Sequence, residues 1–163
     1  QDPGYAIVGY GVIEFKSNRF SVVDYGAITT NAGTPFERRL ELIYDDLNLL
    51  MGKFHPEAMS IEKLFYNTNA KTVIDVAQAR GVTVLAAKKN NIPIFEYTPL
   101  QVKQSVVGYG RAEKKQVQEM TRIILKLAKI PKPDDTADAL AMAICHAHAS
   151  GSLMGKLNSM GIR

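Results

Sequence analysis

The hydrophobic pattern opens with two segments rich in Val, Ile, Tyr and Phe, one from Tyr5 to Phe15 and one from Phe20 to Thr29. The polar residues 16–19 between them have the composition of a turn. Runs of β-branched and aromatic residues on both sides of a short polar segment predict a β-hairpin. We therefore expect the chain to begin with two antiparallel strands.

A helix is predicted directly after the hairpin. Thr34 and Pro35 are followed by Glu37, and these are the residue types of an N-cap, a first helical position and a capping box. The apolar residues that follow have the three- and four-residue spacing of an amphipathic helix, which we expect to cover one face of a sheet. These residues are Phe36, Leu40, Ile43, Tyr44, Leu47, Leu50 and Met51.

The second half of the chain alternates strand and helix patterns. Residues 58–65 are largely apolar and follow Pro56, which predicts an interior strand that carries Glu62 near its end. A helix at 70–89 and a strand at 92–97 come next, and this strand, helix, strand order is typical of parallel pairing and so of a mixed sheet. Further helices are predicted at 100–107, 112–128 and 136–148.

Length and composition fit a single folded domain. The chain has 163 residues, of which 46% are hydrophobic and 22% charged, which suits one hydrophobic core. We expect residues 1–150 to form one α/β domain, with a mixed sheet and helices on both faces, and residues 151–163 to form a flexible tail. The net charge of +4 fits a polyanionic partner but does not by itself identify one.

The expected location is cytoplasmic. Cys145 is the only cysteine, so no internal disulfide is possible, and it lies in an alanine-rich segment that is typical of a buried helix. The sequence shows neither an apolar segment long enough to span a bilayer nor the pattern of a secretory signal, so no membrane partner is expected.

Four carboxylates are candidates for a metal site. Asp135 and Asp138 stand three residues apart at a helix start, so their side chains share one face. Glu62 interrupts an apolar strand, and Asp2 precedes a Pro-Gly pair. Carboxylate oxygens are the donors that a hard divalent ion such as Mg²⁺ prefers, and one reaction that such an ion can catalyse is phosphodiester hydrolysis. Each acid taken alone also has an ordinary role open to it: helix capping together with Asp134, an ion pair for Glu62, and a turn for Asp2.

Five motifs follow one another along the chain: Asp2-Pro3-Gly4, Ser60–Phe65, Ala79-Arg80-Gly81, Gln101–Gly108 and Asp135–Ala141. In order and spacing they resemble the RuvC family of Holliday-junction resolvases over nearly the whole sequence. The resemblance implies an RNase H-like mixed five-stranded sheet and a homodimer. It also implies Mg²⁺-dependent hydrolysis in two opposed strands of a four-way DNA junction, in homologous recombination and DNA repair, beside a branch-migration helicase complex.

The resemblance implies a role for each of the four acids. Asp2 is implied as the ligand shared by two metal ions, Glu62 as the ligand from the central strand, and Asp135 and Asp138 as the ligands from the helix. The two ions would lie about 4 Å apart, and Mn²⁺ is an expected substitute for Mg²⁺. The implied reaction is attack by water, which leaves a 5′ phosphate and forms no covalent intermediate.

Six residues are candidates for DNA contacts: the resemblance implies Lys103, Lys114 and Phe65, and the other three are close to these in the sequence. Basic side chains beside an acidic site attract phosphates, and an aromatic side chain after the central strand can stack on unpaired bases. The ordinary alternatives are surface lysines and, for the aromatic residue, core packing. The six residues are Phe65, Tyr66, Lys103, Arg111, Lys114 and Lys115.

The predicted helix at 70–89 is apolar around much of its circumference, at Val73, Ile74, Ala77 and Gly81. A helix that only covers one sheet face needs a narrower apolar stripe. By the resemblance, this region is the dimer contact.

One position departs from the family pattern. The resemblance implies an apolar residue of a buried first strand before Asp2, and Gln1 stands there. We therefore expect further residues upstream of Gln1.

Two other functions are compatible with parts of this pattern. The actin-like and sugar-kinase group binds nucleotide phosphates with Asp-x-Gly on a hairpin, and Gly4, Gly9 and Gly11 permit this. That group needs a second domain, for which 163 residues leave no room. The non-enzymatic alternative is a junction-binding module that does not cut, and the four acids argue against it because added negative charge weakens DNA binding.

Overall fold

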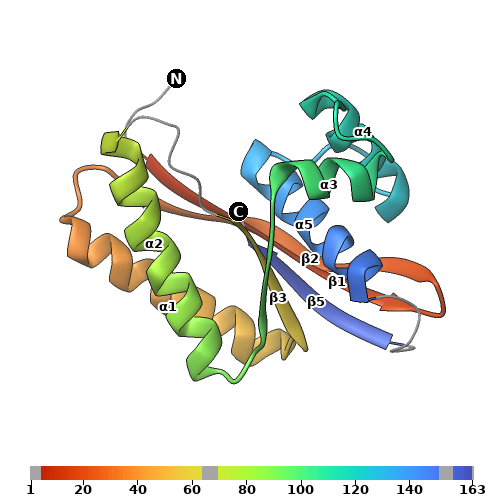
Figure 1. Cartoon of the computed structure of the whole chain (residues 1–163). Coiled ribbons are helices and arrows are strands. Elements are labelled where there is room, and N and C mark those ends of the chain that lie inside the picture. The colour runs from red at the N-terminus through yellow and green to blue at the C-terminus, as the bar shows by residue number, and fades with distance from the viewer. Residues whose placement is uncertain (1–4, 64–69, 151–155, 163) are drawn as a thin grey trace.

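A five-stranded mixed sheet forms the centre of the protein (Figure 1), whose computed structural model describes residues 5–63, 70–150 and 156–162. The strands are β1 (Tyr5–Lys16), β2 (Arg19–Asn31), β3 (Ala58–Glu62), β4 (Ile94–Tyr97) and β5 (Lys156–Ile162). The helices are α1 (Phe36–Phe54), α2 (Ala70–Lys89), α3 (Pro99–Val106), α4 (Lys114–Leu125) and α5 (Asp134–Ser150). The strand order is β2-β1-β5-β3-β4, with β1 antiparallel to its neighbours and β3 parallel to β4 and β5. The predicted mixed sheet is confirmed.

The predicted hairpin is formed by β1 and β2. Ser17 and Asn18 make the turn between them, with φ of 52° and 63°. Two positive φ angles match the right-handed twist of the flanking strands, which is why such two-residue turns close hairpins. Pairing then runs without interruption except for a register shift between Val12 and Ile13.

The start of α1 differs from its prediction. The helix begins at Phe36 after Pro35, and no side chain caps it. The Thr34 amide instead donates to the carbonyl oxygen of Asn31 at 3.0 Å, so this threonine belongs to the turn that leaves β2. The predicted capping box at Thr34 is therefore wrong. A capping box does form at α3, between Thr98 and Gln101.

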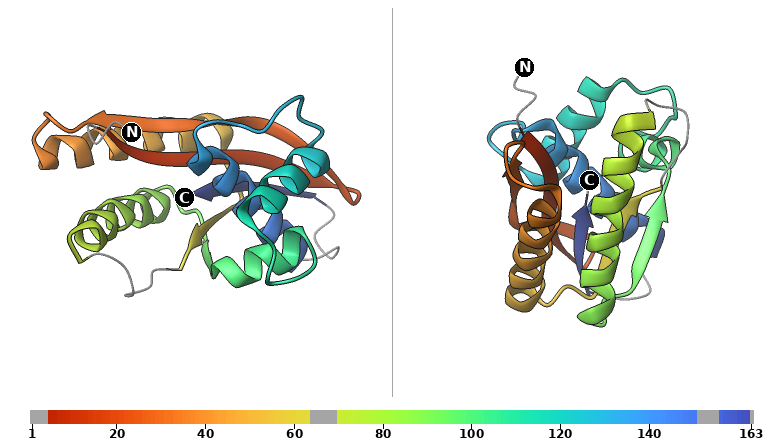
Figure 2. Two further views of the ribbon diagram at one scale, coloured as in Figure 1. Left: turned by 90° about the horizontal axis from the view of Figure 1, so that it is seen from above. Right: turned by 90° about the vertical axis from the view of Figure 1, so that its left-hand side faces the viewer.

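Helices cover both faces of the sheet (Figure 2). On one face α1 and α2 pack side by side, and Leu47 and Met51 of α1 share a buried apolar cluster with Met59 of β3. On the other face lie α3, α4 and α5, which share a second apolar cluster with β1. Among the described residues, no helix combines the length and the apolar character that crossing a membrane requires.

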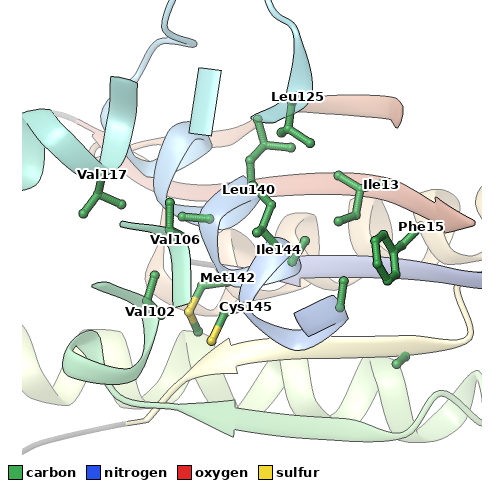
Figure 3. Packing of buried hydrophobic residues seen from close by; sticks show 14 of the residues in the cluster. Ile13, Phe15, Val102, Val106, Val117, Leu125, Leu140, Met142, Ile144 and Cys145 are labelled. Atoms are coloured by element: carbon green, nitrogen blue, oxygen red, sulfur yellow. The ribbon is translucent and has the colours of Figure 1, made fainter. Parts of the chain in front are cut away.

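Helix α5 is buried on almost all sides. Between Thr136 and Ala147, Asp138 is the one residue that is not fully buried. Figure 3 shows Leu140 and Ile144 of α5 in the apolar cluster that β1 shares with α3 and α4. A helix that is apolar around its whole circumference is typical of such an interior position.

The C-terminal segment differs from the flexible tail that was predicted for residues 151–163. Residues 156–162 form β5, in the middle of the sheet between β1 and β3 (Figure 1). Its Lys, Asn, Ser and Gly residues are poor strand formers, so the sequence gives little local signal. The strand pairs because the neighbouring strands expose backbone groups that would otherwise be buried without partners.

Two glycines of β1 allow α5 to approach the sheet closely. A Cβ at Gly9 would lie 2.2 Å from the carbonyl oxygen of Asp135, and one at Gly11 would lie 2.5 Å from the Leu140 side chain. Both positions therefore require glycine for packing. This packing role accounts for Gly9 and Gly11 without any contact to a nucleotide.

Substitution of Gly9 tests this close approach. Because the clashing atom of Asp135 is backbone, Gly9→Ala should lower the free energy of unfolding by about 1–3 kcal/mol or more. Gly52 in α1 is the matched control, since nothing lies within 4 Å of an added Cβ there, and Gly52→Ala should raise stability by about 0.5–1 kcal/mol. Urea denaturation measures both, and a Gly9→Ala protein as stable as the wild type would contradict the packing described.

Candidate active site

The end of β3 is fixed to its neighbours on two sides. Four of the five residues of this strand are fully buried, and Glu62, the last one, is half-buried. The Ser60 hydroxyl donates to the carbonyl oxygen of Met142 in α5 at 3.0 Å. The Lys63 amide donates to the carbonyl oxygen of Tyr97 in β4 at 2.9 Å. Glu62 thus leaves the sheet at a point whose backbone is held in place.

The first turn of α5 is fixed over the hairpin. The Thr136 hydroxyl donates to the carbonyl oxygen of Gly26 in β2 at 3.1 Å. The backbone of Asp135 lies against Gly9 of β1. Asp138 follows one turn later and keeps 22% of its side chain exposed. The acidic end of the helix is therefore positioned by the two strands beneath it.

A cavity of about 260 Å³ lies where β3, α3, α4 and α5 meet. Two of the predicted ligands, Glu62 and Asp138, line it together. Two of the predicted phosphate contacts, Lys103 and Lys114, line the same cavity. The remaining walls are apolar, and they are made by Pro99, Val102, Val117, Ala141 and Met142. Residues far apart in the sequence thus form a single acidic and basic site.

Lys114 links the acids at the start of α5. Its Nζ lies 3.3 Å from Oδ2 of Asp134 and 3.9 Å from Oδ2 of Asp138. Lys132 reaches the other oxygen of Asp134 at 3.3 Å. Hydrogen bonds from Lys132 and Lys114 hold the pKa of Asp134 below its ordinary value. The side chain of Asp134 is thus engaged with two lysines.

Two of the three described carboxylates that were predicted as ligands are placed where they could share a hard divalent ion. Glu62 and Asp138 approach one cavity from two elements, and carboxylate oxygens are the donors that Mg²⁺ prefers. Asp135, half-buried one turn earlier, is not among the residues that line this cavity. Within the described residues, no three acidic, His or Cys side chains form a metal-binding group. Asp2 lies outside the described residues, so the structure describes three of the four predicted ligands, and two of these three share the cavity.

The other predicted DNA contacts fall into two groups. Arg111 and Lys115 are exposed near the start of α4. Lys115 lines a groove on the outer side of this helix together with Val107 and Met120. Phe65 and Tyr66 lie outside the described residues.

The two histidines of α5 have separate partners. Nδ1 of His146 shares a hydrogen bond with the Tyr97 hydroxyl at 2.7 Å, and burial lowers the pKa of this histidine. Nδ1 of His148 shares one with the Ser105 hydroxyl at 2.8 Å. The two rings therefore contact different elements, β4 and α3.

Sequence reasoning missed one residue beside the site. The guanidinium of Arg80 in α2 contacts the carbonyl oxygen of Glu62 at 3.3 Å. Its only signal in the sequence was its place in the motif at 79–81, which gave it no role.

Comparison with known proteins identifies the family. The family profile described as crossover junction endodeoxyribonuclease RuvC matches residues 1–146. The RuvC proteins of Ruminiclostridium cellulolyticum and Clostridioides difficile, both described by the same words, are 62% identical over 156 residues and 56% identical over 160 residues. The alignments cover 94% of this chain and 94% of the first relative, and 98% of this chain and 94% of the second.

Solved structures agree with the RNase H-like fold that was predicted. Thermus thermophilus RuvC in complex with Holliday junction substrate matches with a TM-score of 0.81 at 29% identity, over 96% of this chain and 95% of that one. The structure described as Thermus thermophilus RuvC matches with the same TM-score at 28% identity and the same coverage. The chain is therefore an endonuclease that belongs to the RuvC family of crossover junction endodeoxyribonucleases.

Proposed function

We propose that this protein resolves four-way DNA junctions by Mg²⁺-dependent hydrolysis of phosphodiester bonds in two opposed strands, during homologous recombination and DNA repair. The observation that carries the proposal is the cavity in which Glu62 and Asp138 meet Lys103 and Lys114. Carboxylates suit a divalent ion, and lysines suit the phosphates of the substrate. Support also comes from the matching Thermus thermophilus protein, which is described in complex with Holliday junction substrate.

The acids are proposed as the ligands of up to two ions. Glu62 and Asp138 would hold them from the cavity, with Asp135 and Asp2 completing the set, and Mn²⁺ would substitute for Mg²⁺. When bound, such an ion polarises the phosphoryl oxygen and makes water a better nucleophile at neutral pH. The acids contribute by fixing where that chemistry occurs, since they come from strand and helix ends that the core holds rigidly.

The lysines offset the charge of the acids. Without them, carboxylates in a cavity would repel the phosphate backbone. Lys114 already lies near Asp138, and Lys103 approaches from α3. We place both against the phosphates next to the bond that is cut. Arg111, Lys115, Phe65 and Tyr66 are proposed as further contacts to the DNA.

A homodimer supplies the second cut. Two opposed strands are cut symmetrically when a two-fold axis relates two identical sites. The outer side of α1 and α2 exposes large apolar side chains: Leu49 is 71% exposed, Ile74 59% and Leu85 52%. An apolar surface of this kind suits a contact between protomers.

A branch-migration helicase complex is the proposed functional partner. The cytoplasm, which holds the chromosome in bacteria, is the proposed location.

Junction cleavage tests the proposal directly. The protein is incubated with a labelled mobile four-way junction or a linear duplex of matched sequence, with Mg²⁺ or with chelator. Paired symmetric nicks are expected in the junction alone and only with Mg²⁺, because the acids need an ion to act. Junction binding without nicks would instead indicate a binding module that does not cut, and equal cutting of both substrates would contradict the assigned substrate.

Asp138→Asn tests the acidic site. The substitution keeps the size of the side chain but removes a charged oxygen donor, so cleavage should fall at least about 100-fold. Junction affinity in chelator should be retained, because one negative charge is lost. The exposed acid Asp45 on α1 provides the control variant Asp45→Asn, which should cut as the wild type does. Normal cleavage by Asp138→Asn would show that the Asp138 carboxylate is not needed for the reaction.

Lys114→Ala tests the phosphate contact. Loss of one contact should weaken junction binding and reduce the slope of log affinity against log salt by about 1. Lys88→Ala is the control, since Lys88 is exposed in the last turn of α2 and does not line the cavity, so this variant should leave the slope unchanged. Affinity is measured by fluorescence anisotropy across a salt series. An unchanged slope for Lys114→Ala would show that Lys114 makes no phosphate contact.

A further inference from the structure

One guanidinium joins α2 to the ends of β3 and β4. Nε of Arg80 donates to the backbone carbonyl oxygen of Glu62 at 3.3 Å. Nη2 of Arg80 lies 2.5 Å from Oε2 of Glu96 in β4. The Arg80 side chain is only 22% exposed, so these contacts are partly shielded from water. They reach the strand end that carries a proposed metal ligand.

The carbonyl that Arg80 contacts belongs to the peptide between Glu62 and Lys63. The N–H of this same peptide donates to the carbonyl oxygen of Tyr97 at 2.9 Å. A trans peptide is planar, and its C=O and N–H point to opposite sides. Arg80 and Tyr97 therefore hold the plane from both sides. This position lies one residue beyond Ile61, the last residue of β3 that pairs with β5.

The orientation of that peptide plane sets where the Glu62 carboxylate goes. The plane fixes ψ of Glu62, and ψ together with φ determines the direction in which the Cα–Cβ bond leaves the backbone relative to the strand. Glu62 lines the cavity with Asp138. A small rotation of the plane would therefore move one carboxylate relative to the other.

We propose that Arg80 is a positioning residue for the nuclease site: it clamps the Glu62–Lys63 peptide so that the Glu62 carboxylate faces Asp138 across the cavity. The inference rests on the proposed function, because what it positions is a proposed metal ligand. Glu96 holds the guanidinium in place through the second nitrogen. When a residue that contacts and orients a metal ligand is replaced, metal affinity or activity falls by about 10–100-fold.

The chemistry of arginine explains why a lysine does not suffice. A guanidinium is a planar fork that donates from several nitrogens in fixed directions, and so it can contact a carbonyl and a carboxylate at once. An ammonium is a point charge on a flexible stem. Arg80→Lys keeps the charge and loses the fork, whereas Arg80→Met loses both.

The experiment compares Arg80→Lys and Arg80→Met with the wild type. Arg38→Met is the matched control, because Arg38 makes an exposed ion pair with Glu41 on α1. Binding of Mn²⁺ is followed by electron paramagnetic resonance without DNA, and the Mg²⁺ concentration for half-maximal cleavage and kcat are measured with a junction. Junction affinity in chelator and Tm without metal complete the set.

Both Arg80 variants should bind Mn²⁺ about 10–100-fold more weakly, or show kcat lower by that factor, with junction affinity in chelator unchanged within about twofold. Glu96→Gln keeps the contact with the Glu62 carbonyl and should have a smaller effect. Arg38→Met should match the wild type in every measurement.

Three outcomes overturn the proposal. One is wild-type Mn²⁺ binding and cleavage in Arg80→Met, and a second is a lower Tm with unchanged metal dependence, which would make Arg80 a structural anchor only. Weaker junction binding in chelator, with metal binding unchanged, would also overturn it and make Arg80 a DNA contact. If the wild type binds Mn²⁺ but does not cut junctions, the proposed substrate fails, and the Mn²⁺ titration alone still decides the role of Arg80.

Discussion

Helix α5 lies so close to β1 that no side chain fits between them at Gly9 and Gly11. Glycine at these positions allows a helix buried on almost all sides to rest directly on the sheet, with α3 and α4 packed over it. Because the helix is fixed there, its first turn lies over the hairpin and Asp138 reaches the cavity that also contains Glu62. The packing that stabilises the core and the geometry of the acidic site therefore have the same cause.

The site balances opposite charges that come from different layers of the fold. Its acids stand at the ends of β3 and α5, and its lysines stand on α3 and α4, which reach the site only because they pack on the outer side of α5. Lys114 lies between Asp134 and Asp138, so part of the acidic charge is neutralised before any substrate arrives. A site built in this way can attract both a divalent cation and a phosphate, whereas acids alone would repel the second.

Strand ends are the places where this fold needs additional contacts. The hydrogen bonds between strands orient the residues within a sheet, and Glu62, the last residue of β3, is also a proposed metal ligand. The backbone there is held by α2 through Arg80 and by β4 through Tyr97. Strand β5, in the centre of the sheet, needs no such additional contacts. It is held by its pairing with β1 and β3, although its residues have low β-propensity.

The sequence by itself determined most of the local elements and which acids are proposed as ligands. The hairpin, the amphipathic α1 and the helix at 70–89 follow from patterns within each segment. The order of the motifs along the chain identified Glu62 and Asp138 as candidate ligands. Tertiary structure decided the rest: that Thr34 joins a turn, that residues 156–162 form a central strand, and that Arg80 reaches Glu62. These features depend on partners distant in sequence, whose positions no local pattern of residues specifies.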